Sequence, residues 1–187
     1  MPSEKPPMEK SGEAKPEQLD LAREQGRAYE RALMEMTQKE AHGQQKQVDE
    51  YLVGVAVEHA EGTWQRVDGD LEWKLPDREN AHLEVAVRDA ADGRFIPGLH
   101  VELTVEDEQG KEIGTHEQPF LWHPWLYHYG RNWEIPDSGT YTLRVHVDAP
   151  EFGRHDSKNG KRYAKPVDVT FEGISIETGQ KRTTPSD

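Results

Sequence analysis

Residues 51–176 form short segments in which every second residue is apolar, and turn signals separate these segments about every ten residues. A period of two is the pattern of a β-strand that buries one face. Asp-Gly and Asn-Gly pairs, which favour tight turns, stand at 68–69, 92–93 and 159–160. No helical pattern interrupts this series. We therefore expect an all-β fold, an immunoglobulin-like antiparallel β-sandwich over residues 49–177.

The individual strands follow from the same alternation. A first strand, residues 51–57, carries apolar residues on both faces. The Asp68-Gly69 pair predicts a tight hairpin between residues 64 and 73. The later strands are expected to bury Leu83, Val85 and Val87, then Leu99, Val101, Leu103 and Val105, then Tyr141, Leu143, Val145 and Val147, and finally Val167, Val169 and Phe171.

A helical period precedes the strands. From Pro16 to near Gly43, apolar residues recur at spacings of three and four, which predicts a helix of roughly seven turns. We assign residues 16–46 to this α-helical extension. Met34 and Met36 lie within it, but residues two apart point to different sides of a helix, so the pair does not favour a metal site.

Both ends of the chain have a polar composition with little to bury. We expect disordered tails at residues 1–15 and 178–187.

Composition argues against several functions. A net charge of −13 without a basic patch argues against nucleic acid or an anionic membrane as a partner. Without cysteine, any metal must be held by histidine, carboxylate or methionine. The sequence has no apolar run of about 18 residues, and residues 1–15 lack the apolar core of a signal peptide. As written it indicates a cytoplasmic protein, whereas a trimmed export signal would indicate a periplasmic or other extracytoplasmic one.

Residues 119–133 concentrate aromatic side chains. They contain five of the chain's eleven tryptophans and tyrosines, and two prolines and a glycine interrupt any regular period. We expect an irregular loop that must pack on something or bind something. Filling the end of the sandwich and offering a stacking surface to a sugar or peptide both remain open.

Two residues on a predicted strand are candidate metal ligands. His82 and Glu84 are two apart, so both project from the same face, with about 7 Å between their Cα atoms. His128 and His155 lie in segments that can fold back over that face. Three imidazoles and one carboxylate suit Cu(II), Fe(II) or Zn(II), whereas Ca(II) and Mg(II) prefer oxygen ligands.

The alternative is that the His-x-Glu pattern only marks the solvated face of a strand. His100 and Glu102 repeat the pattern on the neighbouring strand, and we expect them at the surface. The remaining histidines without convincing partners are interpreted as surface or packing residues: His42, His59, His116 and His146.

Several motifs follow one another in a particular order: His82-Leu83-Glu84, His128-Tyr129-Gly130-Arg131-Asn132, Gly139-Thr140-Tyr141, then Pro150 and Arg154-His155 before Pro166-Val167. This order resembles that of bacterial periplasmic iron-transport proteins, small immunoglobulin-like proteins that work beside an iron permease. The resemblance covers residues 51–176. It implies copper as the bound metal, iron as the cargo, a homodimer, and a metal shell of His82, Glu84, His128 and His155.

One position departs from the family pattern. Family members have a methionine in the loop ahead of the His-Tyr-Gly motif, whereas this chain has Leu121, Trp122 and His123 there. If His123 takes that place, the site exchanges a soft thioether for an imidazole. Metal selectivity should then shift away from Cu(I) towards Cu(II), Fe(II) or Zn(II).

The leading hypothesis is a non-enzymatic metal-binding protein with copper or iron as its ion, zinc being possible, and His123 as a further ligand. Trp122, Trp125 and Tyr129 would form a lid that restricts water. Because imidazole binds metal only when neutral, affinity should weaken as the pH falls through about 6.5. The alternatives are an immunoglobulin-like interaction or carbohydrate-binding module without metal and, third, an iron-dependent enzyme.

Overall fold

A computed structural model describes residues 8–39 and 42–185. It contains one helix, α1 (Pro16–Lys39). The strands are β1 (His42–Val48), β2 (Tyr51–Glu58), β3 (Ala60–Glu61), β4 (Thr63–Val67), β5 (Asp70–Lys74), β6 (Ala81–Asp89), β7 (Val101–Glu106), β8 (Glu112–Glu117), β9 (Phe120–Trp122), β10 (Tyr127–Trp133), β11 (Gly139–Val147), β12 (Val167–Ile176) and β13 (Gln180–Lys181).

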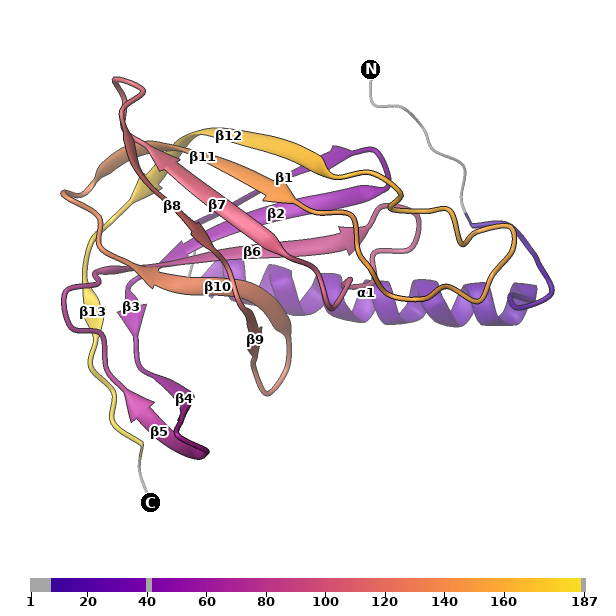
Figure 1. The fold of residues 1–187 in the computed structure, drawn as a ribbon, viewed down its shortest axis with the longest axis horizontal. Helices are drawn as coiled ribbons and strands as arrows, with labels where there is room; N and C mark the ends of the chain where they lie inside the picture. Colours follow the sequence, from indigo (N-terminus) through magenta and orange to yellow (C-terminus); the bar gives the residue numbers. More distant parts are fainter. Residues whose placement is uncertain (1–7, 40–41, 186–187) are drawn as a thin grey trace.

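Two antiparallel sheets form the body of the molecule. One has five strands in the order β1-β2-β6-β10-β9, and the other has four in the order β12-β11-β7-β8. Figure 1 shows the two sheets facing each other. The predicted all-β sandwich is confirmed.

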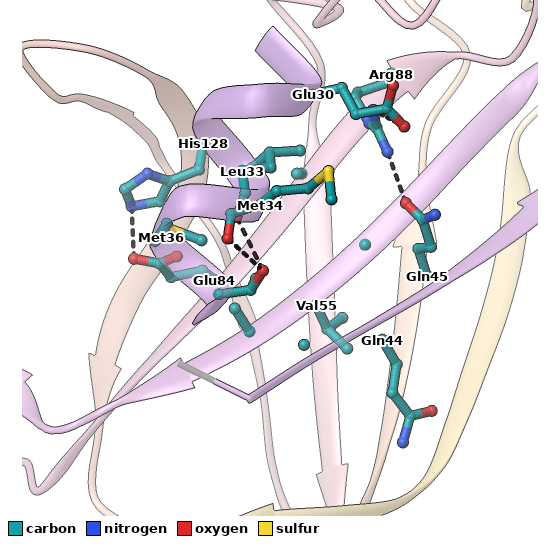
Figure 2. Close-up of a pocket in the computed structure, with 15 residues that line it drawn as sticks. Glu30, Leu33, Met34, Met36, Gln44, Gln45, Val55, Glu84, Arg88 and His128 are labelled. Atoms are coloured by element: carbon teal, nitrogen blue, oxygen red, sulfur yellow. Dashed lines mark hydrogen bonds and ion pairs between the residues drawn. The ribbon is translucent and has the colours of Figure 1, made fainter. Parts of the chain in front are cut away.

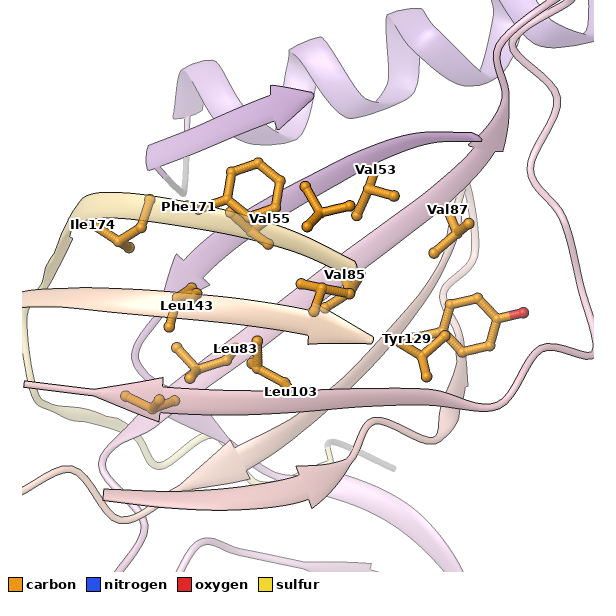
Figure 3. Packing of buried hydrophobic residues seen from close by; sticks show 14 of the residues in the cluster. Val53, Val55, Leu83, Val85, Val87, Leu103, Tyr129, Leu143, Phe171 and Ile174 are labelled. Carbon is orange, nitrogen blue, oxygen red and sulfur yellow. The ribbon is translucent and has the colours of Figure 1, made fainter. Parts of the chain in front are cut away.

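The core lies between these sheets. Alternate residues of β2, β6, β7, β11 and β12 point inwards, and Val53, Val85, Leu103, Leu143 and Phe171 are all buried in one cluster (Figure 3). The period of two in the sequence therefore has its expected cause, because successive side chains of a strand alternate between the core and the outer face.

Helix α1 covers the outer face of the five-stranded sheet (Figure 1). At its C-terminal end Met36 packs against Ala56 of β2 and against Leu126, which lies between β9 and β10. Nearer its middle, Gly26 lies against the turn at Asp92, where an added Cβ would come within 1.7 Å of a backbone oxygen. The apolar seam of the helix thus packs on the sheet.

The helix changes the environment of β6. All nine residues of this strand are buried, the inward ones by the sandwich core and the outward ones beneath α1 and the neighbouring strands. The interpretation of His82 and Glu84 as a solvated polar face is therefore wrong. A single strand gives no sign of a distant element that covers its second face.

Two element boundaries differ from the sequence expectation. The helix ends at Lys39, and β1 (His42–Val48) pairs with β2 along its whole length. Strand β1 was not predicted, because its sequence is mostly glycine, glutamine and lysine without an apolar alternation.

The expectation of an irregular aromatic loop is also wrong. Residues 119–133 contain a hairpin, in which β9 pairs with β10 from Tyr127↔Trp122 to Tyr129↔Phe120. Pro119 precedes β9, and Pro124 lies in the connection between the strands. Neither proline removes a hydrogen bond from the ladder itself, so the hairpin tolerates both.

The predicted hairpin at Asp68-Gly69 is confirmed as β4 and β5, which form a separate two-stranded sheet. Of the residues expected in the terminal tails, Ser11 donates a hydrogen bond to Asp156, and β13 pairs in parallel with β3. No helix among the described residues is long and apolar enough to cross a membrane.

Candidate metal centre

Strands β6 and β10 bring three candidate ligands together on the outer face of the five-stranded sheet. Because Leu83 and Val85 of β6 point into the core, His82 and Glu84 point to the outer face. Glu84 lines a cavity together with residues of α1, and His82 lies towards the β4–β5 hairpin. On β10, Tyr129 points into the core, which turns His128 outwards. The two strands are hydrogen-bonded neighbours, so the three outward side chains meet.

The ligand atoms of these residues converge. Glu84 Oε1 lies 3.7 Å from His82 Nε2 and 3.4 Å from His128 Nε2. One ligand atom from each residue lies within 4.8 Å of the others, the spacing of atoms that share one metal ion. Figure 2 shows the His128 imidazole facing the Glu84 carboxylate.

Burial sets the electrostatics of the site. His82, Glu84 and His128 are only 1%, 5% and 4% exposed. Burial, together with smaller effects of repulsion from His82 and His123, lowers the pKa of His128 to about 3. Burial also lowers the pKa of His82, and the hydrogen bond that His82 donates to Asn132 partly opposes this shift. Both imidazoles are therefore neutral at pH 7, with lone pairs free to bind a cation.

This burial changes the expected pH response. In the folded protein these imidazoles do not take up protons at pH 6.5, so proton competition for the site begins at lower pH. The expectation that affinity weakens through about 6.5 is corrected downwards, because that expectation assumed the pKa of a solvated histidine.

Asn132 fixes the orientation of His82. Its Nδ2 donates to the carbonyl of Glu61 at 2.7 Å, which leaves its Oδ1 facing His82 Nδ1 at 2.9 Å. Since a carbonyl oxygen only accepts, Nδ1 carries the proton, and Nε2 presents its lone pair to Glu84. Asn132 was noted in the sequence as part of a motif, but its role needed the β6–β10 register Asn132↔His82.

Gly130 makes room between the two histidines. It stands on β10 opposite Glu84, and a Cβ there would come within 3.1 Å of His128 Cδ2 and 3.2 Å of His82 Nε2. A side chain at this position would occupy the space in which the imidazoles approach each other. The lack of space for a side chain explains why a glycine suits the third position of the His-Tyr-Gly motif.

The donor set fits a transition-metal ion. His82 Nε2 and both nitrogens of His128 are buried and have no hydrogen-bond partner among the described residues. A buried imidazole nitrogen without a partner is costly unless a ligand satisfies it. Two imidazoles and one carboxylate suit copper, iron or zinc better than calcium or magnesium.

The other two predicted ligands lie in different places. His123 is close enough to influence His128, and its Nδ1 is buried without a hydrogen-bond partner among residues 8–39 and 42–185. His155 is exposed on the segment between β11 and β12 and lines another pocket, with Phe152 and Tyr163. The structure thus brings His82, Glu84 and His128 together but leaves His155 outside the cluster.

The predicted aromatic lid is wrong in part. Tyr129 belongs to the sandwich core, where its hydroxyl donates to the carbonyl of Ile96 and accepts from the amide of Leu99. Trp122 is 69% exposed, and Trp125 is exposed with its ring edge against His123. Helix α1 covers the site instead, and Tyr29 of this helix donates a hydrogen bond to the carbonyl of Tyr127.

Solved structures with the same fold support this architecture. FetP of a uropathogenic Escherichia coli strain matches with a TM-score of 0.61 and 22% identity, over 74% of this chain and 95% of that one. A copper-bound variant of FetP matches with a TM-score of 0.59 and 20% identity, over 73% and 97% of the two chains. A copper-bound variant of Campylobacter jejuni P19 matches with a TM-score of 0.61 and 18% identity, over 75% and 98%.

No curated protein matches the sequence. A family model does match, and it spans residues 34–174, which include all the candidate ligands. With the resemblance in motif order, the sandwich fold and the converging histidines all in agreement, the chain belongs to the Fe2+ transport protein family.

Proposed function

We propose that this protein binds one transition-metal ion per chain, copper or iron, with zinc possible, through His82, Glu84 and His128. The observation that carries the proposal is the convergence of two buried, neutral imidazoles on Glu84 Oε1, at 3.7 and 3.4 Å. Burial of these polar groups costs free energy when no cation is bound, and their geometry suits them to hold a cation. The role is non-enzymatic: the ion is carried rather than used for chemistry.

The known proteins support the choice of ion. The family is that of Fe2+ transport proteins, and copper-bound structures of FetP and P19 have the same fold as this chain. We therefore place this chain in iron uptake, with an iron permease as partner and an extracytoplasmic compartment as the site of action. Co-purification with a permease expressed from the same genome tests the partnership.

His123 and His155 remain predicted ligands. The buried Nδ1 of His123 and its influence on His128 support a place for it beside the cluster. His155 is exposed and therefore accessible to a second copy of the chain. His155 can act as a ligand if the protein is a homodimer in which each chain contributes His155 to the site of the other chain. Sedimentation of the metal-loaded protein tests whether this homodimer forms.

A titration with Cu(II) tests the proposal. The untagged wild-type protein is expected to bind one equivalent, and His82→Ala and His128→Ala are each expected to abolish this binding. His100→Ala, which removes an exposed histidine outside the cluster, is the matched control and should bind like the wild type. Full binding in both site variants, or no binding in the wild type, would refute the proposal.

The exposed aromatic residues favour one second candidate function. Phe120, Trp122, Trp125 and Tyr127 of the β9–β10 hairpin are all exposed. Exposed aromatic side chains of this kind provide contact surface, so a sugar or protein partner fits here without any metal. Binding to a glycan panel that is lost in Trp122→Ala, with no bound metal in the wild type, would favour this function.

A further inference from the structure

A buried methionine lies beside the three proposed ligands. Met36 is near the C-terminal end of α1 and is only 5% exposed, whereas Met34, two residues earlier, is 53% exposed. Both line a cavity of about 370 Å³ that Glu84 and His128 also line. The two methionines thus differ in burial, and Met36 is the one whose side chain is covered by its neighbours.

The contacts of Met36 place its side chain next to the neighbours of two ligands. It packs against Ala56 and Leu126. Ala56 pairs with Glu84 across the β2–β6 ladder, and Leu126 stands two residues before His128. Figure 2 shows Met36 beside both the His128 imidazole and the Glu84 carboxylate.

We propose that the thioether sulfur of Met36 is a fourth ligand of the ion held by His82, Glu84 and His128, and that it lets the site hold Cu(I). This proposal rests on the proposed function. Thioether sulfur is a soft ligand that selects Cu(I), whereas imidazole serves both copper oxidation states. The unbranched methionine side chain has three rotatable bonds, so its sulfur can turn towards an ion without movement of the helix.

The proposal accounts for the departure in the family pattern. The segment ahead of His128 carries no methionine, which led to the expectation of a site with little preference for Cu(I). Met36 lies beside Glu84 and His128, although it belongs to α1 and not to the segment ahead of His128. A soft ligand is therefore present, contributed by a different element of the chain.

A comparison of two conservative variants tests the proposal. Met36→Leu keeps the apolar contacts with Ala56 and Leu126 but removes the sulfur. It is expected to lower the affinity for Cu(I), measured by competition with a chromogenic Cu(I) chelator, by about tenfold or more, equivalent to about 1.4 kcal/mol. Cu(II) should still bind at one equivalent. Met34→Leu, on the same helix, is the matched control and should match the wild type for both ions.

X-ray absorption at the copper edge provides a measurement that needs no mutation. Wild-type protein grown with selenomethionine and loaded with Cu(I) should show one selenium neighbour at bonding distance from copper. The same signal should persist in Met34→Leu and disappear in Met36→Leu. If Met36→Leu fails to fold, the other two spectra still test the proposal. Absence of a selenium neighbour in the wild type overturns it, and loss of that neighbour in Met34→Leu would assign the ligand to Met34 instead.

The outcomes separate this inference from the proposed function. Two results would overturn the methionine ligand and leave the histidine site intact. One is wild-type protein that binds one equivalent of Cu(II) but shows no selenium neighbour when loaded with Cu(I). The other is an unchanged Cu(I) affinity in Met36→Leu. Wild-type protein that binds neither ion overturns both.

Discussion

Asn132 decides which nitrogen of His82 faces the ion. Its Nδ2 donates a hydrogen bond to the backbone carbonyl of Glu61, and its Oδ1 accepts a hydrogen bond from His82 Nδ1. Asn132→Ala is expected to lower Cu(II) affinity by about 10–100-fold, the usual effect of removing such a partner. Asn132→Asp keeps an acceptor for the Nδ1 proton and should retain more of the affinity. Equal affinities in the wild type and Asn132→Ala, measured by calorimetry, would contradict the orienting role.

The buried histidines predict how the metal-free protein responds to acid. Burial lowers the pKa of both His82 and His128, and the pKa of His128 falls to about 3. Between about pH 6.5 and pH 3 the unfolded chain therefore binds a proton at residue 128 that the folded chain does not. The free energy of unfolding should therefore fall as the pH falls through this window. Each such histidine contributes a slope of up to about 1.4 kcal/mol per pH unit.

Urea denaturation in the presence of a chelator, at pH values between 7 and 5, measures whether the free energy of unfolding falls with pH. In His128→Gln the free energy of unfolding should depend less steeply on pH. His146 provides a contrast, because hydrogen bonds to Asp168 and Asp148 raise its pKa, so its contribution to stability grows on acidification. His146→Gln should therefore steepen the loss of stability in acid. The same slope in His128→Gln as in the wild type would show that His128 is not buried and neutral.

Helix α1 acts as the cover of the site, and its position depends on a close contact at Gly26. An added Cβ there would come within 1.7 Å of the Asp92 carbonyl oxygen, so the helix would have to move. Gly26→Ala is expected to destabilise the protein by about 1–3 kcal/mol despite the better helix propensity of alanine. Gly12→Ala meets nothing within 4 Å and is the control.

Chemical denaturation measures this difference, and hydrogen exchange of the β6 amides reports whether the cover has loosened. Faster exchange in Gly26→Ala than in Gly12→Ala would agree with a displaced helix. A Gly26→Ala protein as stable as the wild type would contradict the tight packing of α1 on the turn at Asp92.

Particular elements show how far the sequence alone determines the fold. Strand β2 and the β4–β5 hairpin were predictable, because alternation and an Asp-Gly turn are local signals. Strand β1 was not, since its polar sequence forms a strand only through its neighbour β2. The burial of Glu84 on the outer face of β6 also required α1, which lies more than forty residues away in the chain.

The site was predictable only in so far as it follows from strand geometry and motif order. His82 and Glu84 share a face because they are two apart on one strand, and His128 joins them through the pairing of β10 with β6. Asn132 and Met36 needed tertiary structure. The position of His155 on an irregular segment has no periodicity from which it could be inferred.

The molecule as a whole combines a family sandwich with an added helix. The similar solved structures cover about three quarters of this chain but nearly all of their own, and the family model begins at residue 34. Most of α1 therefore lies before the matched region, yet its C-terminal part lines a cavity together with Glu84 and His128. Most of the helix that covers the proposed site thus precedes the family match, and Met36, the further ligand that we propose, lies at the start of the match.

Anomalous X-ray scattering from crystals loaded with Cu(II) tests the central claim most directly. The account predicts one strong peak per chain at the copper edge, within bonding distance of His82 Nε2, His128 Nε2 and a carboxylate oxygen of Glu84. A chain without a peak at this position, or with its peak only beside His100 and His146, which both contact Asp148, would contradict it.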